Sequence, residues 1–155
     1  MSRESNEIQV SQLEDHLGYW LRYVSNQVSH SFALRVQRRG VTVAEWVFLR
    51  QLFDNPQKPN VLAESMGMTR GAISKLADRL LGKGLIARTE DSQDGRSHIL
   101  SITARGRRLV PLLAAEADEN DREFFGNLES RDREKIMDAM KDIVARHQWK
   151  VLPTQ

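Results

Sequence analysis

The 155-residue sequence predicts a mainly α-helical fold that carries one small β-hairpin. Three observations support this fold class. Residues 59–83 contain two short helical patterns joined by a tight turn, residues 85–102 contain a hairpin pattern, and long amphipathic helical patterns occupy both ends of the chain. We expect residues 42–103 to form one compact domain, and residues 1–38 and 104–155 to form a helical region outside it.

The first predicted helix spans residues 8–38. Its apolar side chains recur every three or four residues and therefore lie on one stripe. The members of this stripe are Leu13, Leu17, Trp20, Val24, Val28 and Phe32. Because the stripe is longer than the core of one small domain requires, we expect the helix to pack on a second chain as well.

A second predicted helix, residues 43–53, is apolar on most of its sides, which predicts deep burial. It opens with Thr42 and Glu45, which have the three-residue spacing of a capping box.

The next two helices are short. Pro59 suits the first position of a helix over residues 59–66, and Gly67 can adopt the left-handed conformation that ends it. Thr69 is expected to cap a helix over residues 70–83. One face of that helix is apolar, and the other carries Arg70, Ser74, Lys75, Asp78 and Arg79. This pattern predicts a helix-turn-helix whose second helix enters the major groove of DNA.

A β-hairpin is predicted directly after this helix. Residues 85–89 and 97–102 read as its strands, and the Asp94-Gly95 pair is a strong turn signal between them. A hairpin in this position makes the domain a winged helix. Arg96 lies just past the tip, within reach of a minor groove or a phosphate, and Asp94 is expected to hold it in position.

The C-terminal part predicts two further helices. Thr103 is expected to cap residues 104–126, and Ser130 to cap residues 131–149. The charged centre of the first, residues 116–123, is expected to be exposed to solvent. Since the central domain does not need these amphipathic helices, we expect the N- and C-terminal helices to form a dimer interface.

Composition and charge exclude several classes of protein. The chain has no cysteine, its four histidines lack metal-ligand spacing, and no apolar run is long enough to span a bilayer. We therefore expect no metal, no cofactor and no membrane contact. Because its polar N-terminus is not a secretory signal, we expect a cytoplasmic protein. Residues 66–108 hold nine basic and four acidic side chains, which is the footprint of a nucleic-acid-binding element.

Four blocks of this sequence resemble the MarR family of bacterial transcriptional regulators: residues 40–49, 62–80, 82–88 and 91–106. The last block is the most specific. In the family's wing, an aspartate, a following arginine and a closing Leu-Thr-x-x-Gly recur at this spacing. The closing leucine is Ile102 here, which is a mild departure.

The resemblance implies a homodimer that binds double-stranded DNA as a transcriptional regulator, a repressor in our expectation. A two-fold dimer should select an inverted repeat. On the matching positions, the recognition helix would contact DNA through Thr69, Arg70, Gly71, Ser74, Lys75 and Arg79. Arg96 would enter the minor groove, with Asp94 as its salt-bridge partner. Each residue also has a plainer interpretation, such as a helix cap for Thr69 or an exposed turn residue for Arg96.

Many members of the family respond to small aromatic or phenolic acids. Trp20, Arg22, Trp46 and Arg50 would suit an aromatic carboxylate, although both tryptophans also lie on stripes typical of a core. A winged helix that binds an acidic protein partner remains an alternative function. An enzyme is not expected, because no nucleophile–base pair or phosphate loop stands out.

Overall fold

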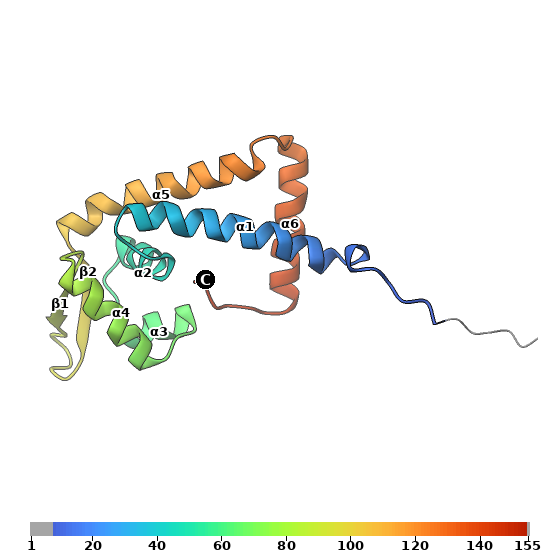
Figure 1. Cartoon of the computed structure of the whole chain (residues 1–155). Coiled ribbons are helices and arrows are strands. Elements are labelled where there is room, and N and C mark those ends of the chain that lie inside the picture. Colours follow the sequence, from blue (N-terminus) through green and yellow to red (C-terminus); the bar gives the residue numbers. More distant parts are fainter. Residues whose placement is uncertain (1–7, 155) are drawn as a thin grey trace, which may run out of the picture.

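The computed structural model describes residues 8–154. The N-terminal heptapeptide, on which the expectation of no secretory signal rests, lies outside them. Helices and one hairpin make up the chain (Figure 1). Their bounds are η1 Leu13–Asp15, α1 Leu17–Arg38, α2 Val43–Asp54, α3 Pro59–Met66, α4 Arg70–Gly82, β1 Ile86–Glu90, β2 His98–Ile102, α5 Ala104–Phe125 and α6 Ser130–Arg146. Within residues 8–154, no helix is both long and apolar enough to cross a membrane.

Helix α2 lies at the centre of the core, as its apolar composition predicted. Phe48, Leu49 and Leu52 are almost completely buried. The side chains that surround them come from α3, α4, β2 and α5, and include Leu62, Ile73, Leu76, Leu80, Leu100 and Leu113. The core therefore fixes α4 and the hairpin against a common support.

The helix ends confirm most of the local predictions. The Thr42 hydroxyl accepts from the Glu45 N–H, and the Glu45 carboxylate accepts in return from the Thr42 N–H. Gly67 has φ +61°, the left-handed conformation expected of it. Thr69 caps α4 by accepting from Ala72 N–H, and Thr103 caps α5. The three threonine caps set where α2, α4 and α5 begin.

The hairpin pairs β1 with β2 in antiparallel register, from Ile86 opposite Ile102 to Glu90 opposite His98. Gln57, in the loop before α3, extends this sheet by exchanging two backbone hydrogen bonds with Leu100, at 3.0 and 2.9 Å. The base of the wing is therefore tied to the start of the helix-turn-helix.

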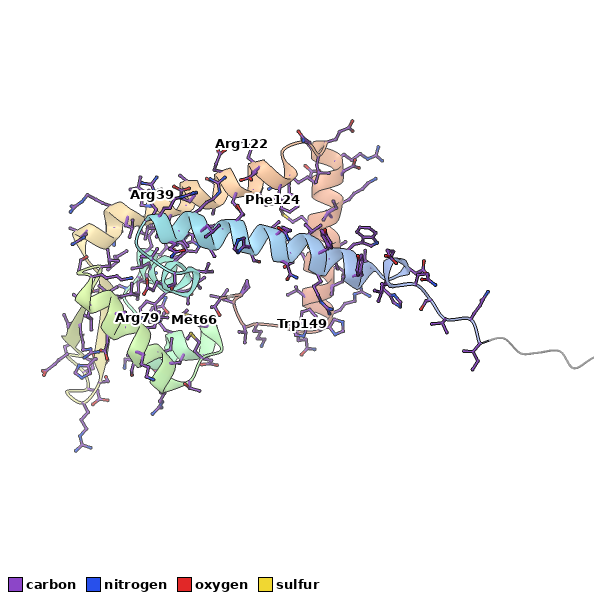
Figure 2. The ribbon with its side chains drawn as sticks, viewed as in Figure 1. Arg39, Met66, Arg79, Arg122, Phe124 and Trp149 are labelled. Carbon is purple, nitrogen blue, oxygen red and sulfur yellow. The ribbon has the colours of Figure 1, made fainter. Side chains whose placement is uncertain are left out.

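Helices α1 and α5 run side by side (Figure 1) and are joined by charged groups. Glu116 pairs with Arg35 at 3.6 Å and with Arg39 at 2.9 Å; Figure 2 labels Arg39 at the end of α1. The hydrogen bond from Arg39, more than any other contact, lowers the pKa of Glu116. Asn120 is buried and donates to the Val28 carbonyl. The expectation that residues 116–123 are exposed to solvent is therefore only partly correct. Asp118, Glu119, Arg122 and Glu123 are exposed, whereas Glu116 and Asn120 face α1 and its C-terminal end.

Two predicted helix starts are also wrong. Helix α1 begins at Leu17 rather than Ile8, after the short turn η1. Side chains compete with the helix here: Asp15 accepts from the Gln12 N–H, and the Trp20 indole donates to the Glu14 carbonyl. At the other end, Ser130 is the first residue of α6, and Glu129, with extended backbone, takes the cap position.

Apolar side chains remain uncovered on the terminal helices of this single chain. Residues exposed there include Leu17, Trp20 and Val24 on α1, and Ile136, Met140 and Val144 on α6. After α6 the chain turns back toward α2 and α3 (Figure 1), where the Leu152 N–H donates to the Ser65 carbonyl at 3.0 Å. Residues 150–154, which we call the C-terminal tail, therefore lie against α3.

Candidate nucleic-acid interface

One face of α4 is polar and open to solvent. The predicted contacts at its start and along it are all exposed: Thr69, Arg70, Gly71, Ser74, Lys75 and Arg79. The opposite face is buried through Ile73, Leu76 and Leu80. Helical periodicity separates the two faces, so the apolar stripe that fixes α4 on the core also turns the polar residues outward.

A groove of about 380 Å³ separates α4 from the wing. We call it the wing groove. Arg70 and Ser74 line it from α4, Asp94 and His98 from the hairpin, and Lys58 from the loop before α3. Arg70 and Ser74, two of the predicted DNA contacts on α4, thus lie across the groove from Asp94, a predicted contact of the wing.

Asp91 anchors the wing, and the sequence analysis did not identify it as a functional residue. It is only 8% exposed and forms an ion pair with Lys58 at 2.8 Å. It also accepts from the Gln93 N–H and the Ser97 hydroxyl. The hydrogen bond from Lys58 is the main cause that lowers the pKa of Asp91, and the same bond raises the pKa of Lys58. Aspartate side chains often accept a hydrogen bond from the backbone N–H two residues later in a turn. This tendency could have predicted the bond from the Gln93 N–H to Asp91, but not the ion pair with Lys58.

The tip of the wing differs from the expected geometry. Asp94 accepts from the backbone N–H of Arg96 at 3.1 Å, and the ion pairs formed among residues 8–154 do not include an Asp94–Arg96 pair. Asp94 therefore shapes the turn rather than holding the guanidinium, because its carboxylate is bound to the backbone. The Arg96 side chain is exposed at the tip.

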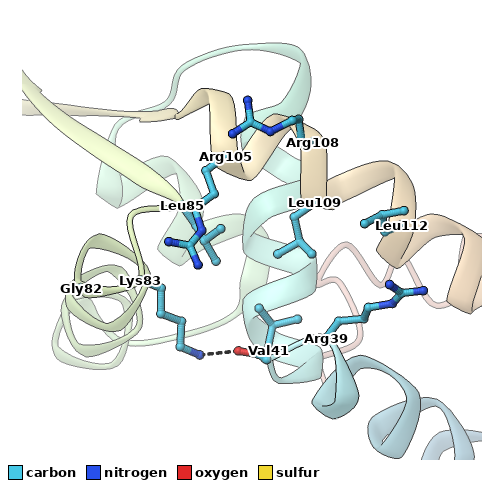
Figure 3. Close-up of a pocket in the computed structure, with 10 residues that line it drawn as sticks. Arg39, Val41, Gly82, Lys83, Leu85, Arg105, Arg108, Leu109 and Leu112 are labelled. Carbon is cyan, nitrogen blue, oxygen red and sulfur yellow. Dashed lines mark hydrogen bonds between the residues drawn. The ribbon is translucent and has the colours of Figure 1, made fainter.

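A buried carboxylate fixes the far end of α4. Glu45, only 1% exposed, accepts from the Lys83 ammonium at 2.8 Å, and its other oxygen lies 3.7 Å from Nε of Arg79. Lys83 also donates to the Gly40 carbonyl, the bond drawn in Figure 3. Glu45, a member of the capping box of α2, therefore also pairs with Lys83 at the end of α4, and the local sequence did not reveal this second role. Arg79 therefore lies on the polar face of α4 and also close to the Glu45 carboxylate.

The four predicted ligand-binding residues are not all brought together. Trp46 and Arg50 line a cavity of about 430 Å³, which we call the Trp46 cavity, with Phe32 of α1 and with Leu152 and Pro153 of the C-terminal tail. Trp20 and Arg22 do not line it, and Trp20 is 50% exposed. Arg50 pairs with Asp54 at 2.9 Å. The structure contains no cluster of three or more potential metal ligands in its described part.

Comparison of the sequence with known families gives one match in this region. A sequence model described as the MarR family matches residues 39–97, from the loop before α2 to the wing. The chain is 25% identical over 105 residues to the transcriptional regulator HosA of Escherichia coli O127:H6, over 67% of this chain and 78% of HosA. It is 28% identical over 137 residues to an uncharacterized HTH-type transcriptional regulator of Bacillus cereus, over 84% of this chain and 89% of that protein.

Solved structures share the arrangement of helices and wing. A probable transcriptional regulator from Pseudomonas aeruginosa has a TM-score of 0.74 at 27% identity, covering 85% of this chain and 99% of its own. Two others are below 25% identity and establish the fold alone. The Staphylococcus aureus MepR–DNA complex has a TM-score of 0.73 at 22% identity (84% and 98% covered), and Rhodococcus jostii CouR bound to p-coumaroyl-CoA has 0.73 at 24% (86% and 95%).

Proposed function

Because this chain belongs to the MarR family of winged helix-turn-helix transcriptional regulators, we propose that it acts as a homodimeric repressor, which binds an inverted-repeat operator through α4 and the wing. The observation that carries the proposal is the exposed polar face of α4, which is joined to the wing by the wing groove. The MepR–DNA complex shows that a protein of the same fold binds DNA. The relatives named above are transcriptional regulators, and we propose no enzymatic activity for this chain.

The Trp46 cavity supports a second element of the proposal, release from DNA by a small aromatic acid. Trp46 and Phe32 offer aromatic surface, and Arg50 offers a guanidinium that suits a carboxylate. CouR, recorded with p-coumaroyl-CoA, shows that a protein of this fold binds an aromatic acyl compound. Because Trp20 and Arg22 do not line this cavity, the proposal gives them no role in binding the acid.

The function is tested by selecting bound duplexes from a random pool, followed by affinity measurements with two variants. We expect a selected inverted repeat with half-sites about 10 bp apart. Lys75→Ala should cost about 1–3 kcal/mol and relax preference at one position of each half-site, because a base contact is lost. Arg96→Ala should weaken binding to all sequences and reduce the salt dependence by about one phosphate contact per subunit.

Arg131→Ala, an exposed arginine at the start of α6, is the matched control and should leave affinity unchanged. Unchanged affinity and salt slope in Arg96→Ala would remove the wing from the DNA interface. An unchanged preferred sequence in Lys75→Ala would remove the recognition role of α4. If an acidic protein bound the same face and no duplex did, the protein-interaction alternative would replace this function.

A further inference from the structure

The wing, which projects from the helical body (Figure 1), is attached to the loop before α3 at two points. Gln57 exchanges backbone hydrogen bonds with Leu100, whose partner across the hairpin is Arg88. The next residue, Lys58, forms its ion pair with Asp91 at 2.8 Å. Because Asp91 is three residues beyond Arg88, the two attachments are separated by about 10 Å along the strand. Two separated points fix the direction of the wing, whereas one point would let it turn.

The second attachment is the one that reaches residues 91–97, the loop that forms the tip of the wing. Bonds inside this loop, such as that from the Asp91 N–H to the Ser97 carbonyl at 2.9 Å, fix only its own shape. Within residues 8–154, no other ion pair or hydrogen bond joins this loop to an element outside the hairpin. A two-stranded hairpin is only marginally stable by itself. Without Lys58, the loop would therefore be able to move about the Gln57 attachment.

Lys58 is itself held firmly where the helix-turn-helix begins. It occupies the N-cap position of α3 with extended backbone, at φ −78° and ψ 147°. The proline that follows it, Pro59, disfavours the helical conformation for Lys58. The Lys58 carbonyl accepts from the N–H groups of Val61 and Leu62, at 3.1 and 3.2 Å, and Leu62 is completely buried. The pair with Asp91 therefore connects the tip loop to the core through a well-fixed stretch of backbone.

A direct contact with a DNA phosphate is the alternative role for a lysine in this place, because Lys58 lines the wing groove beside Arg70. The charge of Lys58 is already compensated, however, by the almost buried carboxylate of Asp91. The oxygen of Asp91 that pairs with Lys58 also accepts from the Ser97 hydroxyl. Arg70 takes part in none of the ion pairs found among residues 8–154. Arg70 is therefore the cation available to a phosphate, and Lys58 is occupied by the wing.

We propose that the Lys58–Asp91 pair is the positioning element of the wing. It fixes the direction of residues 91–97 relative to α4, and it thereby places Arg96 against the operator. The second statement rests on the proposed function, in which Arg96 contacts DNA, whereas the first concerns the free protein alone. Both members of the pair are positioning residues, since neither needs to touch the nucleic acid.

Affinity for the selected operator tests the DNA part, at a temperature where melts show every variant folded. Asp91→Asn and Lys58→Met should both bind at least about fivefold more weakly, because each breaks the same charge-assisted bond. Electrostatic repulsion alone predicts the opposite for Asp91→Asn, which removes a negative charge close to phosphates. Lys58→Arg should stay within about twofold of the parent, because a guanidinium also pairs with a carboxylate.

Coupling to Arg96 shows whether the pair acts through the tip. In an Arg96→Ala background, Asp91→Asn should cause no further loss of affinity, because the wing no longer contributes to binding. Hydroxyl-radical footprints of Asp91→Asn should lose protection where the wing lies and keep it where α4 lies. Tighter binding by Asp91→Asn, or a loss that is additive with Arg96→Ala, contradicts the proposal. The first of these results would make Lys58 a direct phosphate contact.

Amide hydrogen exchange of the free protein tests the attachment without DNA. Residues 91–97 should exchange faster in Asp91→Asn and Lys58→Met than in the parent, whereas α4 should exchange at the same rate in all three. Asp142→Asn, which breaks an exposed pair with Arg146 on α6 at 2.9 Å, is the matched control for exchange and affinity alike. Unchanged exchange in residues 91–97 overturns the proposal. If the parent bound no duplex, the proposed function would fail, and this exchange would still decide whether the pair holds the wing.

Discussion

Two glycines show how differently a single added methyl group acts in this fold. Gly106 lies in the first turn of α5, where a Cβ atom would collide with the Leu85 carbonyl oxygen and with Ile102. Gly71 lies in the first turn of α4, where a Cβ atom would meet nothing within 4 Å. Gly106 permits close packing of α5 on the hairpin. Gly71 has no side chain that projects from the polar face of α4, so another molecule can approach that part of the helix closely.

Gly106→Ala should therefore destabilise the protein by about 1–3 kcal/mol, because backbone of the hairpin cannot move aside easily. Gly71→Ala should be neutral or stabilising by up to about 1 kcal/mol, since alanine favours the helix. Urea denaturation at one protein concentration measures both. On the proposed function, Gly71→Ala should also weaken DNA binding, although it folds well. Equal stability of the two variants would contradict the packing at Gly106.

Asp91 gives the wing a dependence on pH whose sign follows from its lowered pKa. A carboxyl group with a lower pKa in the folded state stabilises the fold above its unfolded pKa, and that stabilisation is lost as the pH falls through the folded pKa. Asp91→Asn should accordingly melt at a lower temperature than the parent at pH 7. The difference should shrink below about pH 4, where the unfolded aspartate protonates.

Thermal melts of both proteins between neutral and acid pH provide the measurement. Asp118→Asn, on the exposed surface of α5, is the matched control for the substitution itself. If the difference between parent and Asp91→Asn were constant with pH, the Lys58–Asp91 pair would not stabilise the folded state through its charge.

At the scale of elements, the sequence correctly predicted the helix caps and turns, which depend only on residues close together in the chain. The caps at Thr42, Thr69 and Thr103 and the turn at Gly67 are local arrangements, so their spacing was sufficient. The exposed polar residues of α4 followed from its helical period for the same reason. The pairs Glu45–Lys83 and Lys58–Asp91 join residues far apart in sequence, and periodicity carries no information on such contacts.

The predicted ligand residues illustrate the same limit. Trp20 and Trp46 both lie on apolar stripes, but a stripe does not say which element will face it. In the structure Trp46 lines one cavity together with Phe32 and the C-terminal tail, while Trp20 lies near the exposed start of α1. The start of α1 was missed because Asp15 and Trp20 bind backbone atoms of residues before the helix.

The contact between α3 and the C-terminal tail can be measured by a double-mutant cycle. Gly67 has a left-handed backbone, and a Cβ atom there would lie 2.5 Å from Cγ1 of Val151. Gly67→Ala should cost about 1–2 kcal/mol for the backbone alone and more for the contact with Val151. In a Val151→Ala background the second part should disappear. If the effects of Gly67→Ala and Val151→Ala on the free energy of unfolding were additive, the C-terminal tail would not contact Gly67 in solution.

At the scale of the whole molecule, the uncovered apolar residues of α1 and α6 are the basis for proposing a dimer. Light scattering at micromolar concentration should return about twice the 17.8 kDa mass of one chain. Ile136→Glu should lower this mass toward that of one chain, because it buries a charge in the interface. Val61→Glu is the matched control, since Val61 on α3 and Ile136 are both 47% exposed. A single-chain mass for the parent protein would remove the homodimer from the proposed function.

The hydrogen bond that holds the C-terminal tail joins two backbone atoms, the Leu152 nitrogen and the Ser65 oxygen. Replacement of either side chain leaves both atoms in place, so point mutations at these positions can accumulate during evolution without breaking the bond. The number of residues between the end of α6 and Leu152 is different, because it sets how far the chain reaches. Selection on this contact should therefore preserve the length of residues 147–151 more strictly than their identity, and a one-residue deletion there should undock the tail.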